Sequence, residues 1–196
     1  MADETPKGDR IAKVLARAGV ASRRDSEKLI EAGRIKINGH KIFSPALNVQ
    51  PNDKIEFDGE PIEPPEEPRL WLYHKPIGLV TSARDEKGRE TVFDNLPENL
   101  PRVVSVGRLD MSSEGLLLLT NDGGLKRTLE LPSTGWTRRY RVRIKGYPRE
   151  GAFEPLTKGI TVEGEHFQPM TVQLDRKTGA NFWLTIGLKE GKNREI

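Results

Sequence analysis

Asp110 is the residue whose type and placement best fit covalent chemistry. It lies between two apolar segments, Val103–Val106 and Leu116–Leu119, in the stretch VVSVGRLDMSSEGLLLL. Both segments have strand character, because the first is β-branched and the second is too short for helical amphipathicity or a membrane span. A carboxylate on a loop at a strand end can act as a nucleophile, since the sheet fixes the loop. The pattern is also typical of an aspartate that caps a turn through Ser112 and Ser113.

The neighbouring segments predict the elements that position this loop. Leu116–Leu119 predicts a strand buried on both faces, after which Asn121–Gly124 turns the chain. Val103–Val106 predicts a second strand that ends at Gly107. Upstream, Leu70–Tyr73 predicts a strand and Thr91–Leu96 a short helical turn.

Tyr140 is the second residue suited to function. The segment RRYRVRI, residues 138–144, alternates basic with apolar or aromatic side chains and predicts a half-exposed strand. One face then carries Tyr140, Val142 and Ile144, and the other carries Arg139, Arg141 and Arg143. A tyrosine among arginines can stack on a base while the arginines hold phosphates, so Arg139 is a candidate RNA contact. The position is equally typical of a core tyrosine.

Composition excludes several other chemistries. The 196 residues with 35% hydrophobic content predict two domains. There is no cysteine, and three widely spaced histidines give no metal site or Ser-His-Asp triad. No apolar stretch marks secretion or membrane insertion, so we expect a cytoplasmic protein without a membrane partner. The net charge of +3 allows a polyanionic partner without requiring one.

The first forty residues have the pattern of a small basic module. Apolar residues at 11, 14, 15 and 18 predict an amphipathic helix that stops at Gly19. Ser22 with Asp25 predicts the start of a second helix, and RIKINGHKI predicts a hairpin around Asn38-Gly39. Two helices and a hairpin with basic outer positions predict a nucleic-acid-binding module, and an ordinary solvated charged surface is the alternative. The candidate RNA contacts are Arg10, Lys13, Arg17, Arg23, Arg24, Lys28 and Arg34.

This module resembles a known RNA-binding domain. RIAKVLARAGVASRRDSEKLIEAGRIKINGHKI is similar to the domain shared by ribosomal protein S-four and several RNA-modifying enzymes, and the resemblance covers about residues 8–60. It is followed by DGEPIEPPEEPR, whose four prolines and four glutamates predict a linker of limited flexibility. We therefore expect an S-four-like domain at 1–60, a linker at 61–69 and a second domain at 70–196.

Four motifs extend the resemblance to essentially the whole chain. LYHKPIGLVTS, GRLD, RRYRV and EGKNREI, in this order, resemble the RsuA/RluB-type family of ribosomal RNA pseudouridine synthases. The loop Ala83–Pro97 is most like the branch that acts on large-subunit rRNA. The resemblance implies an α+β protein: a small N-terminal helix-hairpin domain and a catalytic domain on a mixed, mostly antiparallel sheet. It also implies a monomer that isomerises uridine in 23S rRNA with no cofactor and no metal.

The resemblance assigns roles to individual residues. Asp110 matches the catalytic carboxylate, Tyr140 the tyrosine that stacks on the target base and helps remove a proton, and Arg108 the arginine that fills the space left by the flipped nucleotide. The third motif adds RNA contacts and a residue that packs near the base, namely Lys192, Asn193, Arg194 and Ile196. In relatives this motif continues with a basic partner of the aspartate. Because this chain ends at Ile196, we expect a truncated sequence, with Lys192 or Arg194 as alternative partners.

The chemistry that the resemblance implies needs only such residues. Uridine becomes pseudouridine when the bond from ribose to ring nitrogen breaks and the ring rejoins through carbon, without redox change. The carboxylate either attacks the anomeric carbon or removes a proton from the sugar's second carbon. The main alternative function is a non-enzymatic rRNA-binding or ribosome-assembly protein. A tRNA-ligase fragment would need an ATP site, but the sequence has no Gly-rich phosphate loop. A nuclease would need clustered metal-binding carboxylates, and Glu114 and Asp122 are not suitably spaced for that.

Overall fold

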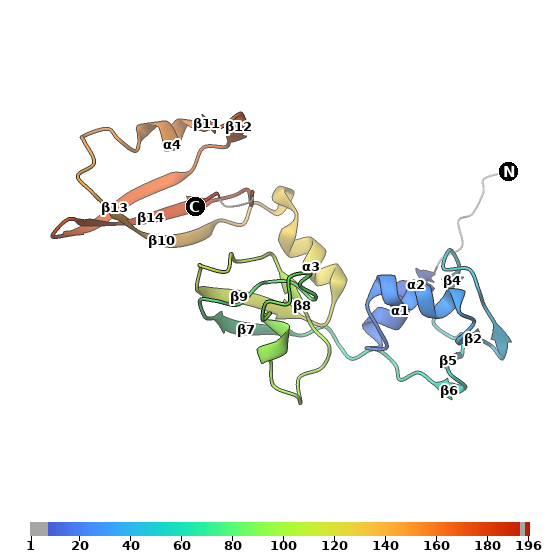
Figure 1. Cartoon of the computed structure of the whole chain (residues 1–196). Coiled ribbons are helices and arrows are strands. Elements are labelled where there is room, and N and C mark those ends of the chain that lie inside the picture. Colours follow the sequence, from blue (N-terminus) through green and yellow to red (C-terminus); the bar gives the residue numbers. More distant parts are fainter. Residues whose placement is uncertain (1–7, 193–194) are drawn as a thin grey trace, which may run out of the picture.

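The chain folds into three units in sequence order, each with its own hydrophobic core (Figure 1). The computed structural model describes residues 8–192 and 195–196. We call the three parts the N-terminal unit (8–61), the central lobe (70–134) and the C-terminal lobe (138–192). All paired strands in the described residues are antiparallel, and one isolated parallel bridge joins Val80 to Thr91. This α+β architecture confirms the predicted fold class.

The N-terminal unit packs two helices on small sheets. Its elements are β1 (Asp9–Arg10), α1 (Ile11–Arg17), α2 (Arg23–Glu31), β2 (Ile35–Ile37), β3 (His40–Lys41), β4 (Asn48–Val49), β5 (Ile55–Phe57) and β6 (Glu60–Pro61). The strands form a sheet of order β3-β2-β5-β6 and a β1-β4 pair. Ile11, Leu15, Ile30 and Ile35 are fully buried between helices and strands.

Local signals explain these elements. The Ser22 side chain accepts a hydrogen bond from the Asp25 backbone N–H at 3.1 Å, which is the predicted cap of α2. Asn38 and Gly39 have φ of 51° and 83° and join β2 to β3, as a two-residue hairpin turn requires. Helices, cap and hairpin all confirm the predictions.

The central lobe contains β7 (Leu70–Lys75), the 3-10 turn η1 (Phe93–Asn95), β8 (Val104–Val106), β9 (Gly115–Thr120), α3 (Gly123–Glu130) and the 3-10 turn η2 (Pro132–Thr134). Its sheet has the order β7-β9-β8. Leu117 and Leu119 face the core, but Leu116 is 66% exposed. The prediction that Leu116–Leu119 is buried on both faces was therefore wrong, because only one face of this sheet is covered.

A second correction concerns the residues after β9. Asn121–Gly124 was predicted to turn the chain, but it leads directly into α3. The Asp122 side chain accepts a hydrogen bond from Leu125 N–H at 2.7 Å and so caps this helix. Asn121 instead bonds the chain before β7, because it accepts from Arg69 N–H and donates to the Glu67 carbonyl.

The C-terminal lobe is a three-stranded sheet covered on one face. It contains β10 (Arg138–Lys145), α4 (Glu154–Lys158), β11 (Ile160–Val162), β12 (Glu165–Phe167), β13 (Thr171–Thr178) and β14 (Asn181–Leu188). The sheet order is β10-β14-β13, and β11 pairs with β12 in a separate hairpin. In Figure 1, α4 and this hairpin lie on one side of the sheet. Val142 and Ile144 face the resulting core, as the alternating pattern of β10 predicts.

Candidate active site

Asp110 lies on the loop between β8 and β9, and its side chain is exposed. Within residues 8–192 and 195–196, its carboxylate takes part in no hydrogen bond and no ion pair. The turn at this point is closed by backbone atoms, since Ser113 N–H donates to the Asp110 carbonyl at 3.0 Å. The aspartate side chain therefore does not act as a turn cap here, and the carboxylate is presented to solvent.

The side chain of Lys75 holds the Asp110 loop through hydrogen bonds. This lysine, at the end of β7, is fully buried. Its Nζ donates to three carbonyl oxygens: Pro76 at 3.0 Å, Asp110 at 3.0 Å and Ser113 at 2.8 Å. All three ammonium donors thus have partners, which is what a buried lysine requires. Burial lowers the pKa of Lys75, and the nearby charge of Asp110 opposes this shift.

Two further contacts fix the loop from the segment after β7. The buried Thr81 hydroxyl donates to the Leu109 carbonyl at 2.8 Å and accepts from Leu109 N–H at 3.3 Å. Gly78 N–H donates to the Met111 carbonyl at 2.7 Å. Residues 75–81 therefore hold the backbone on both sides of Asp110, a rigid support of the kind that reactive groups need.

Helix α3 supports the start of the same loop. The Glu130 carboxylate accepts a hydrogen bond from Gly107 N–H at 2.7 Å. Lys126 pairs with Glu130 and also donates to the Ser105 carbonyl at 2.6 Å. The loop is thus connected to β7, to α3 and to its two flanking strands. Arg108, next to Asp110, is exposed.

Tyr140 comes from the other lobe. It lies on β10 opposite Ile186 of β14, half-buried on the core face of that sheet. Burial raises the pKa of Tyr140, the negative charges of Glu195 and Asp110 raise it further, and the positive charge of Arg138 lowers it. The phenol therefore stays protonated at neutral pH.

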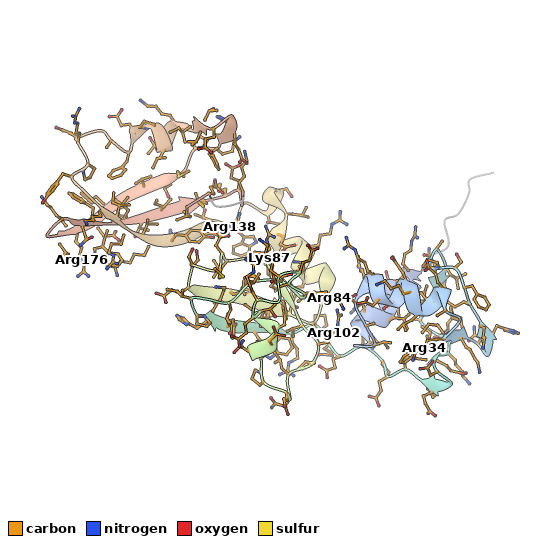
Figure 2. All side chains as sticks on the ribbon, viewed as in Figure 1. Arg34, Arg84, Lys87, Arg102, Arg138 and Arg176 are labelled. Carbon is orange, nitrogen blue, oxygen red and sulfur yellow. The ribbon has the colours of Figure 1, made fainter. Side chains whose placement is uncertain are left out.

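Arg138 shares the Tyr140 face of β10, whereas the predicted contact Arg139 lies on the opposite face. The Arg138 guanidinium donates to the Lys189 carbonyl at 3.2 Å. A Cβ on Gly191 would lie 2.9 Å from Arg138 Nη1, so the glycine leaves room for the guanidinium. Figure 2 shows Arg138 on the side of the C-terminal lobe that faces the central lobe. Its positive charge is therefore held on the Tyr140 side of β10.

The third-motif residues are only partly placed. Lys192 pairs with Glu165 at 3.7 Å, and its ammonium also donates to the His166 carbonyl. Lys192 is therefore held at the β12 strand, and the described residues give it no contact with Asp110. Ile196 is 51% exposed. The predicted contacts Asn193 and Arg194 lie outside the described residues.

The predicted basic contacts of the N-terminal unit differ in how freely they can bind an anion. Those with a carboxylate partner are Lys13, Arg17, Lys28 and Arg34. Arg10, Arg23 and Arg24 are exposed and have no ion pair in the part of the chain that the structure describes. Arg17 pairs with Asp122 at 3.2 Å and so joins the N-terminal unit to the central lobe.

A hollow of about 760 Å³ lies beside this junction. The N-terminal unit contributes Arg24 and Lys28, and the central lobe contributes Arg84 and Arg102. Figure 2 shows Arg84 and Arg102 between the two units. Burial lowers the pKa of Arg102, and Asp25 across the hollow opposes that shift. The hollow lies apart from the Asp110 loop, none of whose residues lines it.

Comparisons with known proteins identify the family. The family model described as RNA pseudouridylate synthase matches residues 69–196, and the S4 domain model matches residues 9–55. The chain belongs to the RNA pseudouridylate synthase family. The match decides between an enzyme of this family and a non-enzymatic binding protein. It also confirms the S-four-like resemblance of the N-terminal unit, which is an S4 domain.

Relatives of this pseudouridine synthase are found in several bacteria. An uncharacterized RNA pseudouridine synthase of Rickettsia felis is 46% identical over 95% of this chain and 81% of its own length. The ribosomal large subunit pseudouridine synthase B of Bacillus subtilis is 37% identical over 96% of this chain and 78% of its own. The ribosomal large subunit pseudouridine synthase B of Salmonella typhi is 39% identical over 96% of this chain and 67% of its own length. A crystal structure of a pseudouridylate synthase aligns with a TM-score of 0.61 at 25% identity, covering 95% of this chain and 80% of the other.

The described residues were also searched for metal-ligand clusters and for membrane-spanning helices. Among the described residues, no group of three or more His, Cys, Asp or Glu side chains is arranged to hold a metal ion. Across the same residues, no helix has the length and apolar character needed to cross a membrane.

The residues that the sequence analysis missed include Lys75, Thr81 and Arg138, and strand alternation could have located the first and the last. Lys75 has the same strand parity as Trp71 and Tyr73, which pack on the core of the central lobe, so alternation along β7 places it on the buried face. Arg138 lies two positions before Tyr140 on β10, so alternation places both on the same face of the strand. Both signals were present in the sequence: the first needs the predicted strand Leu70–Tyr73 to be extended to Lys75, and the second needs the alternation within residues 138–144 to be applied to Arg138.

Proposed function

We propose that this chain converts uridine to pseudouridine in ribosomal RNA of the large subunit, with Asp110 as the catalytic carboxylate. The observation that carries the proposal is the fixed Asp110 loop. Its anchors bind backbone atoms only, which leaves the carboxylate exposed and unpaired within the described residues. The choice of RNA rests on the relatives named ribosomal large subunit pseudouridine synthase B.

The reaction balances without an external reactant. The bond between C1′ and N1 breaks, the uracil turns, C5 joins C1′, the proton on C5 leaves and N1 gains a proton. Asp110 begins the reaction either by attack at C1′ or by removal of a proton from C2′, and both routes use the ionised carboxylate. Fixing the backbone on both sides of Asp110 holds the carboxylate in line with the sugar and lowers the entropic part of the barrier.

Tyr140 acts on the base. The target uridine must leave its RNA stack, and stacking on the Tyr140 ring offsets part of the cost of a few kcal/mol. Because the raised pKa keeps the hydroxyl protonated, Tyr140 takes up the C5 proton only as it passes its own hydroxyl proton on to solvent water. Arg108 fills the space left by the flipped nucleotide, and Ile196 packs against the base. Lys192, Asn193 and Arg194 contact the surrounding RNA.

The S4 domain supplies RNA affinity from a separate part of the chain. We assign residues 1–60 to this domain, 61–69 to the linker and 70–196 to the catalytic domain. Arg10, Arg23 and Arg24 are the cations best placed to bind phosphates, since no described carboxylate neutralises them. Affinity then falls steeply with salt concentration. The enzyme acts as a monomer in the cytoplasm, where its rRNA substrate is made.

The test is to map pseudouridine by reverse transcription after carbodiimide treatment. Deproteinised large- and small-subunit rRNA are incubated separately with the wild-type chain and with Asp110→Asn. We expect one new stop in large-subunit rRNA, none in small-subunit rRNA and none with the variant. A stop only in small-subunit rRNA would overturn the substrate assignment. A variant as active as the wild type would overturn the role of Asp110.

A further inference from the structure

The outer face of the β10-β14-β13 sheet carries a cluster of arginines around one indole. Trp183 lies in β14, with Arg143 of β10 opposite it on one side and Arg176 of β13 on the other. The guanidinium carbons of Arg141, Arg143 and Arg176 lie 5.0, 5.7 and 5.8 Å from centroids of the Trp183 ring system. This face is opposite the one covered by α4 and the β11-β12 hairpin (Figure 1).

The cluster is short of negative charge. Among the described residues, Asp175 is the carboxylate that forms an ion pair with the cluster; it lies 3.7 Å from Arg141 Nε and accepts a hydrogen bond from the Thr185 hydroxyl at 2.9 Å. Arg143 and Arg176 have no ion pair within the part of the chain that the structure describes, and Arg139 adds a further exposed cation on the same face. Arg139, Arg141 and Arg143 follow one another along the same face of β10, and like charges held this close repel, so folding alone does not favour this arrangement.

The indole orders the arginines. Stacking on an aromatic face restricts the long guanidinium side chains before any ligand arrives, so less conformational entropy is lost on binding. Arginine in this state presents a planar fork to phosphate oxygens and can bind them with two hydrogen bonds. A ring that holds several guanidiniums together therefore forms a ready surface for a chain of phosphates rather than for one small anion.

The surface is distinct from both RNA-facing parts described above. Tyr140 is on the same strand as Arg141 but points to the opposite face of the sheet. Figure 2 shows Arg176 at the far end of the molecule from Arg34 of the S4 domain. An RNA that contacts both surfaces would span all three units of the chain.

We propose that this arginine face, defined as Arg139, Arg141, Arg143, Arg176 and Trp183, binds the phosphate backbone of the substrate RNA away from the uridine that is modified. The identity of the RNA as large-subunit rRNA rests on the proposed function, whereas the binding of RNA phosphates does not. Trp183 acts as a positioning residue that holds the guanidiniums, and Arg143 and Arg176 make the phosphate contacts.

The test measures RNA affinity against salt. The dissociation constant of the full chain for a large-subunit rRNA fragment is followed by fluorescence anisotropy over a series of KCl concentrations. The test variant is Arg143→Gln with Arg176→Gln. The charge-matched control is Arg149→Gln with Lys158→Gln, which changes exposed cations of the same lobe next to and within α4. Trp183→Leu tests the positioning role, and thermal unfolding checks that each variant folds.

We expect the arginine double variant to bind about tenfold more weakly at moderate salt, and its salt slope to fall by about two. Trp183→Leu should weaken binding less and keep the slope, because the charges remain. The control should match the wild type. A test variant within twofold of the wild type would overturn the proposal, and so would an equal loss in the control, since net charge alone would then explain it. If no uridine is modified but the arginine variant still binds weakly, the proposed function fails and the binding surface stands.

Discussion

The two lobes of the catalytic domain are each built on a three-stranded antiparallel sheet with one covered face, yet they use their polar groups differently. In the central lobe the key polar side chains, Lys75 and Thr81, are buried and bond the backbone of the Asp110 loop. In the C-terminal lobe the arginines around Trp183 are on the open face. In the proposed function the contrast separates two tasks: buried hydrogen bonds fix the geometry of the reacting group, and exposed cations attract the RNA.

The open faces of the two sheets also differ in chemical character: one is apolar and the other is positively charged. The central lobe exposes leucines on β7 and β9, with Leu72 76% and Leu116 66% exposed, whereas the C-terminal lobe exposes arginines. Changes in the buried part of the central lobe should therefore affect stability and rate together, and changes on the outer face of the C-terminal lobe should affect RNA affinity.

The largest expected effect on stability is that of Lys75→Met, which keeps the length of the side chain and removes its donors. Three carbonyls lose the partner that the buried ammonium provides, so we expect the free energy of unfolding to fall by about 3–5 kcal/mol. The single-turnover rate at saturating RNA should also fall, measured well below the unfolding temperature. Lys87→Met, in an exposed loop, is the control and should change neither quantity. Wild-type stability in Lys75→Met would contradict the anchoring role.

A pair of leucines on adjacent positions of β9 tests the one-sided burial of the central sheet. Leu117 is 3% exposed, so Leu117→Ala should lower the free energy of unfolding by about 2–5 kcal/mol. Leu116→Ala should change it by less than about 0.5 kcal/mol, because this side chain is on the open face. Urea unfolding of both variants makes the comparison. Equal losses would mean that the outer face is also packed.

Tyr140→Phe separates stacking from proton transfer. The ring remains and the hydroxyl is lost, so RNA affinity should be unchanged while the single-turnover rate falls by about 10²-fold, the lower range for a proton-transfer group. A rate equal to that of the wild type would leave Tyr140 with stacking alone. Because its pKa is raised, we also expect no loss of rate from ionisation of Tyr140 as the pH increases from 7 to 9.

The smallest effect is expected at the contact between the S4 domain and the central lobe. Arg17→Gln removes the pair with Asp122, whose side chains are 31% and 13% exposed, and should lower the free energy of unfolding by no more than about 1 kcal/mol. Lys13→Gln, which removes a more exposed pair within the S4 domain, is the control. A loss of several kcal/mol in Arg17→Gln would show that the two units unfold as one.

Sequence predicted the S4 domain well because its signals are local. The Ser22 cap acts over three residues. The turn at Asn38-Gly39 is set by the backbone preferences of these two residues alone. The Asp110 loop could be located between its strands, but its support could not. Lys75 reaches carbonyls 35 and 38 residues away, and no local pattern encodes such pairs.

The errors have related causes. An apolar run such as Leu116–Leu119 indicates a strand but does not say whether a second layer covers its outer face. The start of α3 was hidden because Gly123 and Gly124 have low helix propensity, and the Asp122 cap and the apolar spacing that follows overcame it. On β10 the alternation was right and included Arg138, and only the assignment of Arg138 to the Tyr140 face was missing.

The most direct test of the account is the single-turnover rate of pseudouridine formation at saturating large-subunit rRNA, compared between Asp110→Asn and Glu114→Gln. Both changes remove one carboxylate charge from the same exposed loop. We predict a loss of more than about 10⁴-fold for Asp110→Asn, as when a nucleophile is removed, with RNA affinity and unfolding temperature unchanged. Glu114→Gln should stay within a few-fold of the wild type. Equal rates for the two variants, or an Asp110→Asn loss explained by weaker RNA binding, would contradict the central claim.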